Sequence, residues 1–398
     1  MQNYWRFVAD NRRWLLGGVL LTLFSSVGQT FFISLFGAEI RTEFALSHGE
    51  FGALYMLATL ASAVTLTQLG RILDHLSLRQ TLCLVLPCLA LAATVMAWSS
   101  ALWTLLLALF LLRLFGQGMM THTALTTMAR WYAGQRGRAV SLVSTGHQWG
   151  EAVFPSLMVL VLGWLSWRQA WLLAASSVIL VLPWVLWLWR VPRQPLHTDP
   201  PSQRSASRDW TRQEVLRDWR FWALCMVVLA PSFIGTTIFF HQDYLSILRG
   251  WPAQTFAQAF VLMASMTIVF GLISGMLIDR YSAVFMLPFF LLPLSLACFA
   301  LWAFTASWGA YIFMAVLGVS YGFSSSLFGA LWPELYGLRH LGGIRALIMA
   351  FMVLGTALGP GLTGVLIDIG VAYPKQILAM GAYCMVASAL MLWMRRLL

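Results

Sequence analysis

Twelve apolar stretches, each long enough to cross a lipid bilayer, follow one another along this 398-residue chain. A membrane-spanning α-helix needs about 20 mostly apolar residues, and 10% charged residues are too few to cover a soluble surface. The sequence therefore predicts an all-α membrane protein with twelve transmembrane helices. The predicted spans are 14–38, 49–70, 80–98, 101–128, 138–163, 167–190, 220–246, 254–278, 283–303, 307–332, 342–368 and 374–394.

One gap between spans is long, rich in proline and arginine, and divides the chain into six spans plus six. We predict an N-terminal six-helix bundle at 1–190, a cytoplasmic linker at 191–219 and a C-terminal six-helix bundle at 220–398.

Basic residues set the predicted orientation. With both termini inside, 20 of the 25 Lys and Arg fall on the cytoplasmic side, as the positive-inside rule requires. The charges lie in short gaps rather than on one soluble face, which excludes nucleic acid as a partner despite the net charge of +11. Compact loops and the lack of glycosylation sequons point to a bacterial inner (plasma) membrane.

The two halves repeat. Gly70 to Asp74 after the second span recurs as Gly275 to Asp279 after the eighth, at an offset of 205 residues, and Gly146-x-x-x-Gly150 in the fifth span matches Gly355-x-x-x-Gly359 in the eleventh. A duplicated six-helix unit is typical of alternating-access carriers, so the bundles are expected to be pseudo-symmetric.

Two of these segments carry a family resemblance. The loop Gly70-Arg-Ile-Leu-Asp-His-Leu-Ser-Leu-Arg79 resembles the motif between spans 2 and 3 of the major facilitator superfamily, with His75 in place of an Arg. The segment Arg113-Leu-Phe-Gly-Gln-Gly118 resembles the span 4 motif of the same superfamily. The resemblance covers the whole chain and implies the major facilitator fold.

The segment 130–139 looks most like the monocarboxylate and oxalate/formate carrier branch. That branch places a basic residue in span 8, whereas 254–278 contains no Arg, Lys or His.

A cytoplasmic gate is predicted at the loop motif and at its repeat. Gly70 permits a tight turn, and Asp74 is placed to pair with Arg79 or Arg130. The second half offers a matching pair in Asp279 and Arg345. The alternative is that these are ordinary loop ion pairs that fix topology.

Ionisable groups at mid-bilayer cost about 2.5–3.5 kcal/mol each on insertion scales, and two neighbouring spans carry them. Helix rise places Arg113 about 22 Å and Glu151 about 20 Å from the cytoplasmic ends of their spans, and we therefore predict that they pair. An i,i+4 spacing puts His147 on the face of Glu151. The pair is either a structural latch or, as we favour, a proton-coupling site in which Glu151 accepts a proton and His147 relays it.

The substrate-binding candidates follow from the resemblance, because the family arranges spans 1, 4, 7 and 10 around a central cavity. They are Gln29, Arg113, Gln117 and Tyr321. Serine and threonine hydroxyls on these spans are more often bonded to their own helix.

These features together predict a secondary active, proton-coupled transporter of a small anionic organic solute, working by alternating access. Alternatives are a multidrug or metabolite efflux carrier and a transport-inactive sensor on the same scaffold. No phosphate-binding loop or activated nucleophile is recognisable, so no enzyme is expected. The prediction includes no metal and no cofactor, and its partners are solute, protons and the lipid bilayer, with the chain acting as a monomer.

Overall fold

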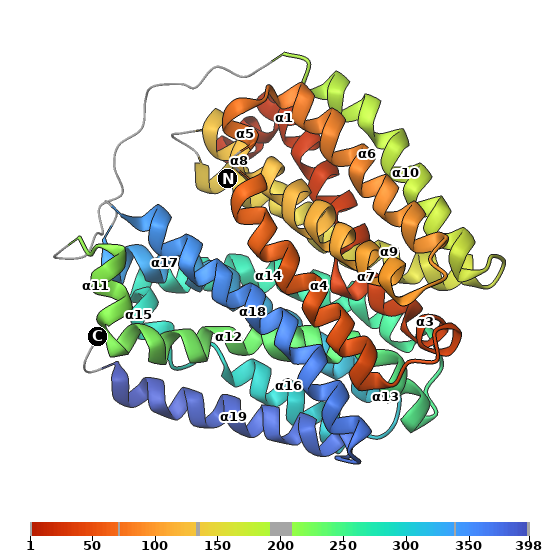
Figure 1. The fold of residues 1–398 in the computed structure, drawn as a ribbon. Helices are drawn as coiled ribbons and strands as arrows, with labels where there is room; N and C mark the ends of the chain where they lie inside the picture. Colours follow the sequence, from red (N-terminus) through yellow and green to blue (C-terminus); the bar gives the residue numbers. More distant parts are fainter. Residues whose placement is uncertain (1, 71, 133–135, 192–208, 338–339, 396–398) are drawn as a thin grey trace. The chain divides into compact units, whose positions relative to one another are not determined.

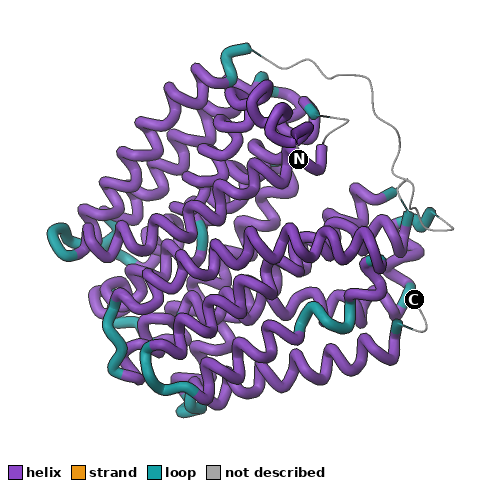
Figure 2. Tube along the Cα trace, turned by 180° about the vertical axis from the view of Figure 1, so that it is seen from behind, coloured by secondary structure: helices purple, strands orange, loops and turns teal. Residues whose placement is uncertain are grey.

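The computed structural model describes residues 2–70, 72–132, 136–191, 209–337 and 340–395. Within these ranges the side chains of Asp74 and Asp279 are among the few that are not described. The described chain is helical apart from turns and contains no strand (Figure 2). It forms two compact units: Met1–Ala45 with Leu57–Pro201, and Leu46–Met56 with Ser202–Leu398. The predicted linker, 191–219, lies mostly outside the described residues, so its boundaries stay a prediction.

The helices of the first half of the chain are shown in red to yellow-green (Figure 1). They are α1 (Gln2–Phe24), η1 (Ser25–Gly28), α2 (Thr30–Ile33), η2 (Ser34–Phe36), α3 (Gly37–Glu43), α4 (His48–Leu69), α5 (Ile72–His75), α6 (Leu78–Ala97), α7 (Leu102–Leu111), η3 (Leu112–Met120), α8 (Thr121–Trp131), α9 (Arg136–Leu162) and α10 (Trp167–Leu188).

The helices of the second half run from green to blue (Figure 1). They are α11 (Arg212–Arg217), α12 (Trp219–Phe240), α13 (Gln242–Arg249), α14 (Gln254–Tyr281), α15 (Ala283–Met286), α16 (Leu292–Ala303), α17 (Trp308–Tyr336), α18 (Leu341–Asp368) and α19 (Tyr373–Met394).

Every predicted span coincides mostly with helix, and the span 283–303 is interrupted by a turn at 287–291. Within the described residues, nine helices are long and apolar enough to cross a membrane, and the bent pair Arg6–Gly28 with Thr30–Glu43 makes a tenth. The other two predicted spans correspond to α9, whose apolar character is diluted by His147, Gln148 and Glu151, and to the short α16 with α15 before it. The predicted all-α membrane fold is confirmed.

The same helix pairs recur in the two units, each described by itself. In the first, α1 packs along α9, and in the second, α12 packs along α18. A Cβ atom added at Gly150 would lie 2.0 Å from Ser26 Oγ, and one added at Gly359 would lie 2.3 Å from Thr237 Oγ1. The glycine patterns that the sequence comparison matched therefore make equivalent close contacts in both units.

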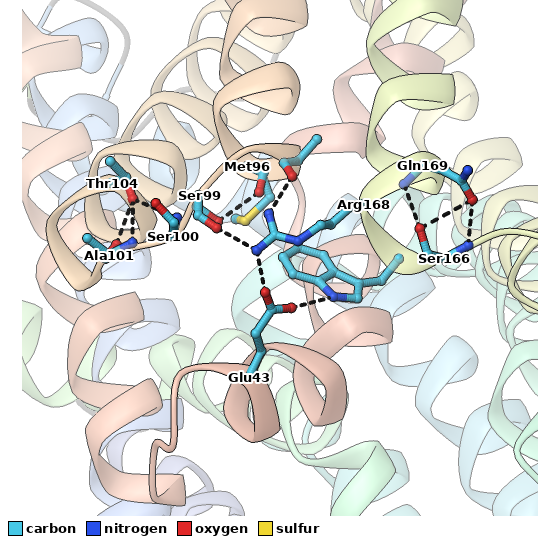
Figure 3. Close-up of polar contacts among 11 residues, drawn as sticks. Glu43, Met96, Ser99, Ser100, Ala101, Thr104, Ser166, Arg168 and Gln169 are labelled. Carbon is cyan, nitrogen blue, oxygen red and sulfur yellow. Dashed lines mark hydrogen bonds and ion pairs between the residues drawn. The ribbon is translucent and has the colours of Figure 1, made fainter.

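A cluster of polar contacts fastens one end of the first unit (Figure 3). Arg168, at the start of α10, forms an ion pair with Glu43 at the end of α3, and it donates to the carbonyl oxygens of Ala97 and Ser99 in the turn after α6. The indole of Trp167 donates to the same Glu43 carboxylate at 2.9 Å. One arginine thus ties three helix ends together by charge-assisted hydrogen bonds.

Candidate functional site

The first span is broken near its middle. α1 ends at Phe24, η1 continues as a tight 3-10 turn, and Gln29 is extended, with φ −86° and ψ 155°. The chain then resumes as α2, and the two segments are bent by 46°. A break of this kind takes backbone carbonyl groups out of the regular helix pattern at a buried position.

The fourth span also departs from a regular helix. Its middle segment, η3, is π-helical over all nine of its residues. π-helical turns are rare, occur mostly as single bulges and are frequently found at functional sites. This segment contains two of the substrate-binding candidates, Arg113 and Gln117, and lies between the regular helices α7 and α8.

The two irregular segments touch at glycine. A Cβ atom on Gly116 would lie 2.6 Å from the Cα atom of Gly28, and one on Gly28 would lie 2.1 Å from the carbonyl oxygen of Leu112. No side chain fits between these backbones, so glycine is required at both positions. This contact brings the break in span 1 against the π-helical turn of span 4.

Arg113 is held at that crossing. Its side chain is 1% exposed, and Nη1 donates to the carbonyl oxygen of Gly28 at 3.3 Å and to Thr30 Oγ1 at 3.4 Å. The carbonyl end of the α1–η1 segment carries partial negative charge, which favours a cation there. The broken helix therefore supplies part of what a buried guanidinium requires.

Glu151 lies on the other side of the break. Its neighbour Gly150 contacts Ser26 of η1, and its Oε1 lies 3.4 Å from His147 Nε2. As the i,i+4 spacing predicts, the two side chains share a face of α9. The side chain of Glu151 is 6% exposed and that of His147 is 34% exposed, so the imidazole lies between the carboxylate and the more open side of the helix.

The contacts of Arg113 and Glu151 given above go to different partners, Arg113 to span 1 and Glu151 to His147. Both residues are buried, and both lie on helices that contact η1. The predicted pair between Arg113 and Glu151 stays a prediction.

The other first-unit candidates lie close to this centre. Gln29 is the half-buried extended residue at the break, and Gln117 is half-buried in η3 beside Gly116. Ser25 bonds back to the carbonyl oxygen of Thr22 in its own segment, as expected for hydroxyl groups on membrane helices.

Tyr321 belongs to the second unit. Its ring packs edge-on against Phe239 at 6.4 Å between centroids, and its hydroxyl oxygen occupies the place that a Cβ atom of Gly235 would need. His241, at the end of α12, is buried, and its Nε2 lies 3.2 Å from the carbonyl oxygen of Pro360.

The gate candidates are only partly described. Arg130 donates to the carbonyl oxygen of Leu73 at 2.9 Å and so reaches α5, the short helix that carries Asp74. Arg345 donates to the carbonyl oxygen of Gly329 at 2.7 Å. The side chains of Asp74 and Asp279 lie outside the described residues, so both acidic partners stay predictions.

Gly70 and Arg79 are described, and they flank the loop motif. Gly70 ends the second span, where a Cβ atom would lie 2.8 Å from the carbonyl oxygen of Leu66 and 3.3 Å from His122 Nε2. The Gly70 N–H also donates to that carbonyl oxygen at 2.8 Å, so Gly70 continues the last turn of α4, and the tight turn after it stays a prediction. Arg79 is exposed in the first turn of α6.

Residues 18–360 match the family model of the Major Facilitator Superfamily. The chain belongs to the major facilitator superfamily. Membership agrees with the predicted twelve-helix architecture and with the two sequence motifs, and it identifies a membrane transporter rather than an enzyme. No curated protein matches the chain in a sequence comparison.

Solved structures of other transporters share this major facilitator fold. The crystal structure of a bacterial homolog of the human lysosomal transporter Spinster, inward-facing and unoccupied, matches with a TM-score of 0.73 at 15% identity, covering 97% of both chains. The occupied form of the same protein matches with a TM-score of 0.70 at 15% identity, covering 96% of both chains. A mutant of the nucleoside transporter NupG gives 0.69 at 16% identity over 96% of this chain and 99% of that chain.

Sequence reasoning missed the two glycines that build the site. Gly28 and Gly116 stand in spans with other small residues, and no local pattern distinguishes a helix break or a π-helical turn from a regular span. A signal was present in the clustering of Ser25, Ser26, Gly28, Gln29 and Thr30, a polar run that weakens an otherwise apolar helix.

Proposed function

We propose that this membrane transporter is a secondary active carrier that moves a small anionic organic solute by alternating access, coupled to protons. The observation that carries the proposal is Arg113, a fully buried guanidinium at the crossing of a broken span with a π-helical span. Arginine presents planar, bidentate donors that match a carboxylate.

The protein surroundings favour an anion over a cation at this place. Among the described side chains of Arg, Lys, Asp and Glu, two are buried, and they are Arg113 and Glu151. A solute anion would carry the charge that is complementary to the Arg113 guanidinium. Gln29 and Gln117 are proposed to orient the solute with their amide groups.

Glu151 and His147 are proposed to handle the proton. When Glu151 is protonated it is neutral, and the anionic solute has no competitor for the positive charge of Arg113. When Glu151 is ionised, its carboxylate competes with the solute for that charge. The His147 Nε2 atom lies 3.4 Å from Glu151 Oε1, and an imidazole can take up and release a proton near neutral pH, so it is proposed to relay the proton to and from Glu151.

The gate completes the proposed cycle. Asp74 with Arg79 or Arg130, and Asp279 with Arg345, are proposed to hold the cytoplasmic ends of the helices closed and to release them during rocking. Gly70 is proposed to allow the turn that places Asp74 near Arg79 and Arg130. We place the chain in a bacterial inner membrane, with both termini cytoplasmic, and expect it to act as a monomer.

The test is uptake by full-length protein in liposomes under an inward proton gradient. A panel of small carboxylates should include transported solutes, and collapse of the gradient should slow their uptake. Transport of hydrophobic cations alone would identify an efflux carrier and contradict the proposal, and transport of nothing in the panel would favour a sensor.

A further inference from the structure

A cavity separate from the buried site opens at one end of the first unit. Its volume is about 580 Å³, and it lies among the start of α6, the end of α8 and the end of α10. Three exposed arginines line it, Arg79, Arg130 and Arg190, together with three tryptophans. Leucines from α5 and the turn after it, from α6 and from α10 make up much of the remaining wall.

The walls of this arginine–tryptophan cavity are held in place by hydrogen bonds between side chains and backbone groups. Arg13 of α1 donates to the carbonyl oxygen of Trp187 at 2.9 Å, and the indole of Trp189 donates to the carbonyl oxygen of Trp14 at 2.9 Å. Ser77 and Gln80 form a reciprocal capping box at the start of α6. The cavity is therefore a built feature rather than a gap between mobile loops.

The positive charge of the cavity favours an anionic ligand. Its described lining residues include three guanidinium groups and no carboxylate. Arg190 lies over the ring of Trp187 at 5.8 Å, and Trp131 packs edge-on against Trp189 at 5.3 Å. Guanidinium groups beside indoles are a common arrangement for phosphate groups at the membrane–water interface.

The surroundings indicate where the rest of the ligand lies. Leu180, Trp184 and Trp187 follow one another at helical spacing along α10, and all three are strongly exposed. This apolar stripe runs into the cavity from the length of the helix. A ligand with an anionic head and an apolar tail fits both features.

We propose that the arginine–tryptophan cavity binds the headgroup of an anionic phospholipid, with its acyl chains along the exposed face of α10. The site lies at the predicted cytoplasmic end, where anionic lipids attract basic residues. The inference shares Arg79 and Arg130 with the proposed cytoplasmic gate but does not depend on the transported solute. A free phosphate shares the headgroup chemistry, and the experiment separates the two.

The test uses the full-length protein in detergent, titrated with dioctanoyl-phosphatidylglycerol, dioctanoyl-phosphatidylcholine or glycerol phosphate, and binding is followed by native mass spectrometry. The anionic lipid should bind at least several-fold more tightly than the zwitterionic one. Glycerol phosphate should bind weakly, because it lacks the chains. Equal binding of the two lipids would overturn the proposal, and tight binding of glycerol phosphate would show that the ligand is a soluble phosphate.

The variant pair R79Q/R190Q should weaken phosphatidylglycerol binding by about 10- to 30-fold, since each basic residue near an anionic lipid surface contributes about 1 kcal/mol. The matched control R12Q/R138Q removes the same charge from exposed arginines of the same unit that do not line the cavity, and it should bind like the wild type. R79K/R190K should retain most of the affinity. Equal loss in both glutamine pairs would reveal a general charge effect and contradict a defined site.

Discussion

The two units repeat the same helix pairs but differ where spans 1 and 4 cross and where their counterparts, spans 7 and 10, cross. In the first unit, Gly28 and Gly116 bring a broken helix against a π-helical turn that carries Arg113. In the second, α12 and α17 are continuous helices, and the hydroxyl of Tyr321 lies against Gly235. One crossing brings backbone groups together with a buried charge, and the other is filled by an aromatic ring.

A second difference concerns the contacts between two glycines. In the second unit, Gly322 of α17 meets the backbone of Gly271 in α14, and Ser274 bonds to the carbonyl oxygen of Gly322 across the same interface. The comparison teaches that duplication preserved the packing, while the ionisable chemistry is concentrated in the first unit, where the helices are irregular.

The largest expected effect is at Arg113. Arg113→Gln should lower uptake of the transported carboxylate at least about 100-fold, because losing one partner of a buried charge pair costs about 2–5 kcal/mol. The measurement is initial uptake rate in liposomes, with R138Q as the exposed-arginine control. Unchanged uptake in R113Q would place the solute elsewhere and remove the functional difference between the units.

The double variant distinguishes binding from a latch. If Arg113 binds solute, combining Arg113→Ala with Glu151→Gln should leave transport abolished. Restored transport in the double variant would show that the two residues only neutralise one another.

The next largest effect is expected from a substitution at Gly116, where spans 1 and 4 cross. Gly116→Ala should destabilise the protein by about 1–3 kcal/mol, the usual cost of overpacking, because its Cβ would lie 2.6 Å from Gly28 Cα. Gly271→Ala in the second unit is the matched change, with its nearest neighbour at 3.8 Å, and should be tolerated. Thermal unfolding in detergent measures both, and equal stability of the two variants would contradict the described crossing.

A smaller effect is expected at Glu151. Glu151→Gln keeps the shape of the side chain but cannot ionise, so the steady-state accumulation driven by the proton gradient, at most about tenfold per pH unit for one coupled proton, should disappear. Uptake at several external pH values checks this. A variant that keeps the wild-type pH profile would show that Glu151 does not carry the proton.

The smallest expected difference concerns the arginines that hold the turns. Arg168 binds the carbonyl oxygens of Ala97 and Ser99 and also pairs with Glu43. In the second unit, Arg249 binds the carbonyl oxygens of Phe304 and Trp302, and no ion pair joins it among the described residues.

Arg168→Ala should therefore lower stability by about 1–2 kcal/mol and Arg249→Ala by less, because hydrogen bonds to charged groups contribute about 1.5–3 kcal/mol and partial exposure reduces this. Thermal unfolding provides the comparison, and solute affinity should not change in either variant. A larger loss of stability in R249A than in R168A would contradict the view that the ion pair with Glu43 adds stability.

The architecture could be predicted from the sequence because lipid imposes one length and one backbone pattern on every span. The shared face of His147 and Glu151 followed from helical spacing alone. The bond from Arg113 to Gly28 could not be predicted, because it depends on where span 1 breaks, and a break is decided by packing between distant glycines. The arginine–tryptophan cavity was also hidden, since its residues come from three separate segments of the chain.

The central claim is that Arg113 binds the anionic solute, and calorimetric titration of the purified protein with a transported carboxylate tests it most directly. The account predicts saturable binding to the wild type and to R138Q, and binding at least about 100-fold weaker to R113Q. Wild-type affinity in R113Q, in a protein that remains folded, would contradict it.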